Sequence, residues 1–349
     1  MPKNVTIKDI AAEAGVAIAL VSFVMNNRIG SDGKRKYRVN EATREKILEV
    51  ARRLNYQPSS AARMLRSGHS KVIGVLLSDI SNVFYGEIAR QLEEMAFLHG
   101  YTVLFGSTDE CPDKLGVLVR SFMDKGVEGF IIVPCEGSED SLRHVIDMRV
   151  PLVVMDRKDF DLPVPRILLD NCGAMKKAVE LLVGRNIRKI DMLSYTMRMS
   201  SIADREAGFV ESMKALGYDE HDIRIHRLPF ENIDAAAAEV LPSIVERGAE
   251  GLVFATNSLT IAAIKRLSAM NVRVQRDIML VGFDNSDVYD CFSPPIPYVR
   301  QPIGAICSNA IAALVDLIEN KTLPAAAETV LDGEVVYNGV DIHNDNILK

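Results

Sequence analysis

Two aspartates and one arginine of this 349-residue chain have the chemistry and the positions of ligand-binding residues. Asp156 and Asp284 each end an apolar run that is typical of a buried strand, and Arg205 lies in DREAGF, where a helix is expected to begin. Carboxylates accept pairs of hydrogen bonds from hydroxyls, and a guanidinium donates a planar fork of N–H groups. The three side chains therefore suit a sugar or another polyol. Each could instead be an ordinary charge at a strand end or a helix cap.

Motifs that would indicate an enzyme are absent from the sequence. It contains no GxGxxG, GxxxxGKS, GxxxxGKT, HExxH or GxSxG segment, and its six histidines are scattered. Its five cysteines form no C-x-x-C pair, which favours buried, reduced thiols over disulfides or a zinc site. We expect no catalytic residues, no metal site and no cofactor, although a catalytic site assembled only by folding stays open.

Strands and helices are expected to alternate around the candidate residues. This alternation predicts parallel sheets with helices on both faces. Segment 250–256 resembles 128–134, and 277–284 resembles 151–156, so two similar α/β lobes are expected. Ligands of such sheets bind at the carboxyl ends of the strands, which predicts a site in a cleft between the lobes. The expected strands are 71–78, 101–107, 128–134, 151–156, 189–195, 250–256 and 277–284, and the expected helices are 84–99, 113–125, 138–149 and 176–184.

The first 57 residues are expected to form a separate helical head. Thr6 and Asp9 resemble a capping box, which predicts a helix from about Ile7, and Gly15 provides a turn into a second helix. A third helix is expected after Asn40, a good N-cap residue. This arrangement is typical of a helix-turn-helix DNA-binding unit; a helical bundle without a nucleic-acid role is the alternative. The expected apolar positions are Ile7, Ile10, Ala11, Ala14, Val16, Val21, Val24, Ile47, Val50, Ala51 and Leu54.

Charge separates this head from the rest of the chain. Residues 1–70 hold thirteen Lys and Arg against six Asp and Glu, whereas the remaining residues hold 28 against 41. A basic head on an acidic body predicts that only the head contacts a polyanion such as DNA. Between the two lies YQPSSAARMLRSGHS, in which Ser59 and Ser60 can cap a short helix over residues 61–66.

The segments VTIKDIAAEAGV, TREKILEVARRLNYQPSSAARMLRSG and IGVLLSDISNVFY resemble the lactose-repressor (LacI/GalR) family of transcription regulators, and the resemblance extends to about residue 340. It implies an α/β chain with a three-helix head, a hinge helix, and a two-lobed body of parallel sheets like that of periplasmic sugar-binding proteins. The implied domains are a DNA-binding head at 1–57, a hinge helix and linker at 58–70, and an effector-binding and dimerisation body at 71–349. Within the body, lobe one is expected at about 71–160 and 296–325, and lobe two at about 161–295 and 326–349.

The resemblance also implies which residues contact operator DNA. Leu65 matches a hinge leucine that wedges into the minor groove and bends the duplex, and Arg66 matches a neighbour that reaches the groove. The expected DNA-binding residues are Thr6, Ala17, Ile18, Ala19, Ser22, Phe23, Asn26, Lys34, Arg35, Lys36, Arg38, Tyr56, Ser59, Ala62, Leu65 and Arg66.

The recognition helix departs from the family pattern, in which Ser, Thr and Arg are usual. Ala17, Leu20 and Phe23 stand at those positions, so hydrogen-bonded base recognition is reduced and contact with thymine methyl groups is favoured. A loop at 28–38 is longer than usual and strongly basic. This loop could bind phosphates beside the groove, or it could be a basic loop that is simply solvated. A third alternative is that it covers Ile18, Leu20 and Phe23, which then do not contact DNA.

For the effector, the resemblance places Ser78 and, more weakly, Gln301 at the pocket. Thr256 stands where the family often has an amide side chain. The threonine offers a hydroxyl to a ligand at this position but no amide group. The aromatic residues Phe84, Tyr85, Tyr195 and Phe230 either stack on a ligand or belong to the core. The expected effector-binding residues are Ser78, Phe84, Asp156, Arg205, Thr256, Asp284 and Gln301.

These features together predict a cytoplasmic, homodimeric transcriptional regulator, most simply a repressor. Its partners are double-stranded operator DNA and a small molecule, expected to be a sugar or a derivative, that either releases or strengthens DNA binding. No signal peptide and no apolar run of membrane-spanning length are expected, and the C-terminus is expected to form one strand and a polar tail without leucine heptads. A free-standing solute-binding protein and a cytoplasmic α/β enzyme acting on sugars are the alternatives.

Overall fold

The computed structural model describes residues 5–25, 39–56, 68–320, 327–337 and 340–341. This part of the chain forms two compact units that divide between Ser70 and Lys71. The expected hinge helix falls within residues 57–67 and therefore lies outside the described residues.

The first unit is a three-helix head built from α1 (Ile7–Ala14), α2 (Ile18–Met25) and α3 (Glu41–Arg53). The Thr6–Asp9 capping box is confirmed, because each side chain bonds the other's backbone N–H. Gly15 ends α1 at φ 67°, a left-handed conformation that glycine adopts without steric cost. The Asn40 side chain accepts a hydrogen bond from the Ala42 N–H and caps α3. The expected apolar positions form one cluster between the three helices, with Ile7, Val16 and Leu54 half-buried at its edge.

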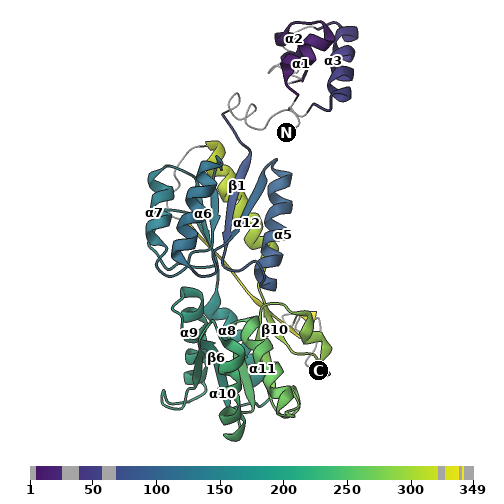
Figure 1. Cartoon of the computed structure of the whole chain (residues 1–349). Helices are drawn as coiled ribbons and strands as arrows, with labels where there is room; N and C mark the ends of the chain where they lie inside the picture. Colours follow the sequence, from purple (N-terminus) through teal and green to yellow (C-terminus); the bar gives the residue numbers. More distant parts are fainter. Residues whose placement is uncertain (1–4, 26–38, 57–67, 321–326, 338–339, 342–349) are drawn as a thin grey trace. The chain divides into compact units, whose positions relative to one another are not determined.

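The second unit contains two sheets, the first of which forms lobe one. All of its strand pairs are parallel. Helices α5 (Val83–Leu98) and α12 (Ile303–Asn320) cover one face, and α6 (Pro112–Asp124) and α7 (Glu139–Asp147) cover the other (Figure 1). The four inner strands of this sheet are buried on both faces, which explains their nearly continuous apolar sequences, whereas the two edge strands are partly exposed. They run in the order β11 (Glu328–Leu331), β5 (Arg166–Leu169), β4 (Leu152–Met155), β3 (Phe130–Ile132), β1 (Val72–Leu77) and β2 (Thr102–Ser107).

The second sheet forms lobe two. Helices α8 (Asn171–Val183) and α9 (Ser200–Ala215) pack together, as do α10 (Ile233–Glu246) and α11 (Asn257–Ala269), and one apolar core joins all four to the sheet. The strand pairs of this sheet are parallel except for β10–β12 and β12–β13, which are antiparallel. A short 3-10 helix, η1 (Asp287–Cys291), follows β9. The strands run in the order β13 (Val340–Asp341), β12 (Glu334–Tyr337), β10 (Tyr298–Arg300), β9 (Met279–Phe283), β8 (Gly251–Phe254), β6 (Ile190–Tyr195) and β7 (Ile225–Leu228).

The chain crosses between the lobes three times, and each crossing comes later than expected. The crossings follow β5, β10 and β11, whereas the sequence analysis places them near residues 160, 295 and 325. In each case a strand of three or four residues pairs with the sheet of the lobe that the chain is about to leave. Such pairing depends on backbone contacts distant in sequence, so local patterns do not reveal it. Strands β5 and β7 and helices α10, α11 and α12 are further elements that the sequence does not predict. The described part of the C-terminal region holds three strands rather than one.

Two expectations about apolar residues need correction. The first expectation is that no apolar run of the sequence has membrane-spanning length. By length and composition alone, however, helix α12 could cross a membrane. Its apolar side chains are buried against α5 and the first sheet, so it serves as a core helix of lobe one. All five cysteines are free thiols, but only Cys135 and Cys307 are buried, whereas Cys111 and Cys291 are exposed.

The contact between α8 and α9 positions the helix that carries Arg205, and Gly208 makes it possible. A Cβ atom on Gly208 would lie 2.3 Å from the carbonyl oxygen of Cys172, whereas nothing lies within 4 Å of a Cβ on Gly304 in α12. We expect Gly208→Ala to destabilise the protein by about 1–3 kcal/mol through overpacking. Gly304→Ala should leave stability unchanged or raise it by up to about 1 kcal/mol through helix propensity. Thermal melts followed by circular dichroism test this, and equal midpoints for both variants would contradict it.

Candidate functional site

The candidate site is a cavity of about 360 Å³ between the two lobes. Its walls come from residues that follow the carboxyl ends of strands in both sheets. Ser78, Glu110 and Asp156 follow β1, β2 and β4 of lobe one, and Thr256 and Asp284 follow β8 and β9 of lobe two. This is where parallel α/β sheets bind ligands, and the volume is that of a small-molecule pocket.

All seven residues expected to bind the effector line this one cavity. They come from segments that are far apart in the sequence, so folding alone brings them together. Their contact with an effector stays a prediction. The seven are Ser78, Phe84, Asp156, Arg205, Thr256, Asp284 and Gln301.

Arg205 of α9 is buried and held rigidly in lobe two. Its Nε donates to Asn171 Oδ1 at 2.7 Å, and its Nη1 donates to the carbonyl of Ala255 at 2.5 Å. The guanidinium lies over the ring of Phe283, 3.8 Å from the centroid. Burial lowers the pKa of Arg205, and attraction to Asp284 opposes this shift. Because no described residue accepts from Nη2, this nitrogen provides donors for a ligand.

Asp284 provides the acceptor on the same side of the cavity. Its Oδ1 accepts a hydrogen bond of 2.6 Å from Gln301, which lies at a crossing between the lobes. Burial raises the pKa of Asp284, whereas the charge of Arg205 and the hydrogen bond from Gln301 lower it. Asp284 and Asp156 both adopt left-handed backbone conformations, with φ of 65° and 71°. Such conformations are uncommon for residues other than glycine and cluster at binding sites.

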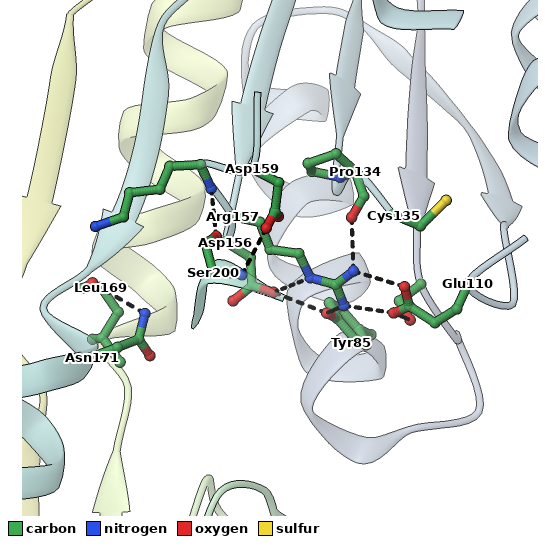
Figure 2. A network of polar contacts seen from close by, with 12 residues as sticks. Tyr85, Glu110, Pro134, Cys135, Asp156, Arg157, Asp159, Leu169, Asn171 and Ser200 are labelled. Atoms are coloured by element: carbon green, nitrogen blue, oxygen red, sulfur yellow. Dashed lines mark hydrogen bonds and ion pairs between the residues drawn. The ribbon is translucent and has the colours of Figure 1, made fainter. Parts of the chain in front are cut away.

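The lobe-one side contains a buried ion pair that the sequence analysis missed. Arg157 donates to both carboxylate oxygens of Glu110, at 2.5 and 2.7 Å, and the two side chains are only 4% and 5% exposed. It also donates to the carbonyl of Pro134 at 2.7 Å and to the hydroxyl of Tyr85 at 3.3 Å, as Figure 2 shows. The remaining nitrogen, Nε, lies 3.5 Å from Asp156 Oδ2. The sequence signal for this pair is an acidic residue after β2 and a basic residue after β4, at the same sheet edge.

This ion pair determines what the neighbouring side chains can do. Ser78 donates its hydroxyl proton to Glu110, so this proton already takes part in a hydrogen bond within the protein. Tyr85 donates to Asp156 Oδ2 at 3.0 Å, and burial raises the pKa of Tyr85 well above its usual value, so the hydroxyl stays protonated. Among the described residues, none donates to Asp156 Oδ1. Asp156 therefore has one oxygen fixed by protein and one available to a ligand hydroxyl.

Thr256 and the aromatic residues have double roles. The Thr256 hydroxyl accepts from the Leu259 N–H and caps α11, and it shares a 2.9 Å hydrogen bond with Tyr195. Phe84 packs edge-on against Tyr85, and Tyr195 packs edge-on against Phe230, with centroids 5.0 and 5.5 Å apart. All four rings line the cavity, and all but Phe230 are buried, so they belong both to the core and to the cavity wall.

Contacts beside the cavity join the two lobes. Asp159 accepts a 2.7 Å hydrogen bond from the Ser200 N–H at the start of α9, and the Ser200 hydroxyl accepts a 2.9 Å hydrogen bond from the Lys158 N–H. Lys158 also forms a 2.8 Å ion pair with Asp204 on α9. The N-cap residue of α9 makes no side-chain cap of its own. A carboxylate from lobe one therefore satisfies the N-terminus of the helix that carries Arg205.

In the head, α2 presents the apolar surface expected from its sequence. Ala17 and Ala19 are exposed and Ile18 is 44% exposed, whereas Ser22 and Phe23 are half-buried. Leu20, which the sequence places on the recognition surface, is half-buried against the head core. Thr6 is exposed but uses its hydroxyl in the helix cap, and Tyr56 packs half-buried against the core. The other expected DNA-binding residues lie outside the described residues: Asn26, Lys34, Arg35, Lys36, Arg38, Ser59, Ala62, Leu65 and Arg66.

Comparison with protein-family models gives two matches. Residues 6–59, which include all three helices of the head, match the bacterial regulatory proteins of the lacI family. Residues 179–338 match a periplasmic binding protein-like domain.

Individual relatives match over most of the chain. The HTH-type transcriptional regulator RegA of Clostridium saccharobutylicum is 29% identical over 320 residues, which are 91% of this chain and 94% of RegA. The structure of a protein described as a ribose operon repressor, from Burkholderia thailandensis, is 29% identical with a TM-score of 0.68, covering 77% of this chain and all of that one. The lac repressor dimer bound to operator and the anti-inducer ONPF shares the fold, with a TM-score of 0.81, 21% identity, and coverage of 97% and 100%.

The cap that lobe one provides for α9 can be tested by substitution. We expect Asp159→Ala to lower stability by about 1 kcal/mol, as loss of an N-cap does. Asp161→Ala is the matched control, since Asp161 is an exposed carboxylate two residues away that does not bond α9. The control should change stability by less than about 0.5 kcal/mol. Urea unfolding measures both, and equal effects would show that the cap is not needed.

Proposed function

Since this chain belongs to the lacI family of bacterial regulatory proteins, we propose that its affinity for operator DNA is controlled by a small polyhydroxylated effector in the interlobe cavity. The chain is a DNA-binding transcriptional repressor, as its matched relatives are regulators and repressors and not enzymes. The effector class and its contacts are the parts that we infer. The main support is that seven residues from two lobes line one cavity.

The free hydrogen-bonding groups of the cavity suit a sugar. Asp156 Oδ1 and the carboxylate of Asp284 accept hydrogen bonds from hydroxyls, and Nη2 of Arg205 donates to hydroxyl or ring oxygens. These groups come from opposite lobes, so a ligand with several hydroxyls can contact both at once. The aromatic walls exclude water from the less polar face of the ligand. Similarity to a protein described as a ribose operon repressor also supports a sugar-sized ligand.

Control of DNA binding follows from a change in lobe orientation. A ligand that contacts both lobes stabilises one orientation of the lobes relative to another. The equilibrium between the two orientations then shifts by the difference in the ligand's affinity for them. By linkage, DNA and effector then change each other's affinity by the same factor, in either direction. We propose that the body acts on DNA through the hinge helix and linker at residues 58–70, with Leu65 as a minor-groove wedge.

We further propose that the protein acts in the cytoplasm as a homodimer. A two-fold protein matches two operator half-sites, and the lac repressor of similar fold is a dimer. Val83, Phe97 and Leu98 of α5 are large apolar side chains that are more than half exposed in the single chain, and a second copy would cover such residues.

On the head, Ile18 and Ala19 offer methyl contacts to thymine, and the basic insert at 28–38 offers phosphate contacts.

The effector site predicts a loss of response without a loss of DNA binding. We expect Asp156→Asn, Arg205→Gln and Asp284→Asn each to abolish the change in operator affinity that the effector causes, a coupling of about 5- to 150-fold in such systems. Operator affinity without effector should stay within about threefold of wild type, because the substitutions lie in the body. Gel shifts with a panel of neutral sugars, beginning with ribose, measure both quantities.

Arg273→Gln is the matched control for this series. Arg273 is a surface residue of lobe two that pairs with Asp277 and does not line the cavity, so its variant should keep the full response. If the cavity variants fold and respond like this control, the effector binds elsewhere. If wild type responds to no sugar in the panel, the proposed effector class is wrong.

A second prediction concerns the hinge. We expect Leu65→Ala to weaken operator binding by about tenfold or more, equivalent to about 1.4 kcal/mol. Binding to non-specific duplex should change much less, because the wedge contributes to a bend that such DNA does not undergo. Both affinities are measured at one salt concentration, since phosphate contacts make affinity depend on salt. Equal losses on both duplexes would contradict the wedge assignment.

A further inference from the structure

The buried Arg157 lies in the wall of the cavity, yet groups of the protein already occupy both of its terminal nitrogens, and only Nε makes no hydrogen bond to a described residue. The four N–H groups on its two terminal nitrogens match four acceptors: two oxygens of Glu110, the carbonyl of Pro134 and the hydroxyl of Tyr85. A planar guanidinium fork is the side chain best suited to bind phosphate or carboxylate in pairs of hydrogen bonds. Here Glu110 occupies that fork from within the protein (Figure 2).

The remaining charges of the cavity also oppose an anionic ligand. Its lining holds four carboxylates, Asp79, Glu110, Asp156 and Asp284, but only two guanidinium groups, Arg157 and Arg205. Because Arg157 is paired with Glu110, Arg205 is the remaining guanidinium of the lining, and its strongest charge interactions are with the carboxylates of Asp284 and Asp156. A phosphate or carboxylate group entering the cavity would therefore meet an excess of negative charge on the cavity wall.

We propose that Glu110 determines the charge class of the effector: by pairing with Arg157, it makes the cavity accept an uncharged polyhydroxylated molecule and reject the phosphorylated or carboxylated analogue. The proposal rests on the proposed function, because it concerns the cavity in which we place the effector. Displacing Glu110 with a ligand anion would leave a buried carboxylate unpaired, and this cost prevents simple exchange of one anion for another. Removing the charge of Glu110 should free the fork and admit an anion.

The test uses full-length protein and inorganic phosphate as the probe, with chloride at matched ionic strength as the reference. We expect E110Q to bind phosphate at least about tenfold more tightly than wild type, measured by calorimetry and by phosphate-dependent melting temperature. The double variant E110Q/R157M should lose this gain, because its cavity no longer contains the fork. All three proteins carry the same basic head, so phosphate bound there contributes equally and cancels in the comparison.

The outcomes separate the alternatives. A gain in E110Q that disappears in E110Q/R157M supports the proposal. A folded E110Q without a gain overturns it, and a gain that persists in the double variant also overturns it, because the phosphate then binds away from Arg157.

A measurement on wild type keeps the proposal falsifiable if E110Q does not fold. Ribose and ribose 5-phosphate, and glucose and gluconate, are compared as ligands by calorimetry. Weaker binding of both anions than of their neutral partners supports the proposal, and tighter binding of either anion overturns it. If no sugar changes operator affinity but E110Q still gains phosphate binding, the proposed function fails while the role of Glu110 stands.

Discussion

The buried contact between Arg157 and Glu110 is the interaction on which the lobe-one half of the cavity depends. Burying two charges is costly, and it is tolerated here because both carboxylate oxygens and all four terminal N–H groups have partners. The same pair orients Ser78 and Tyr85, and Tyr85 in turn holds Asp156. Loss of either charge would leave the other unpaired, at a cost of about 3–5 kcal/mol. One ion pair therefore fixes the geometry of several groups that line the cavity.

Four consecutive residues after β4 connect this half of the cavity to the other lobe. Asp156 faces the cavity, Arg157 anchors the segment in lobe one, and Lys158 and Asp159 bind the start of α9. Because α9 also carries Arg205, the two lobes meet through groups next to those proposed to bind the effector. A ligand that moves α9 relative to β4 must change these contacts. This is a direct physical link between occupancy of the cavity and the orientation of the lobes.

The cavity itself is a consequence of parallel sheets. Helices on both faces bury the strands, so polar side chains can stand only where the strands end. Two sheets whose carboxyl ends face each other bring these polar residues together without a dedicated binding loop. Left-handed backbone conformations at Asp156 and Asp284 turn the chain away from each strand and leave the carboxylates at the cavity. Gly208 allows α9 to pack closely on α8, which positions Arg205 opposite lobe one.

The sequence by itself determined the features that depend on local patterns: the Thr6–Asp9 cap, the Gly15 turn, the alternation of strands and helices, and the strand-end positions of Asp156 and Asp284. Its resemblance to a known family supplied further cavity residues. Only the tertiary structure decided which sheet β5, β10 and β11 join, because three- or four-residue strands are assigned by backbone pairing with distant partners. It also decided that Glu110 meets Arg157, 47 residues away in sequence, and that Asp159 caps a helix of the other lobe. Such contacts follow from where sheet edges meet in space, which composition and periodicity do not encode.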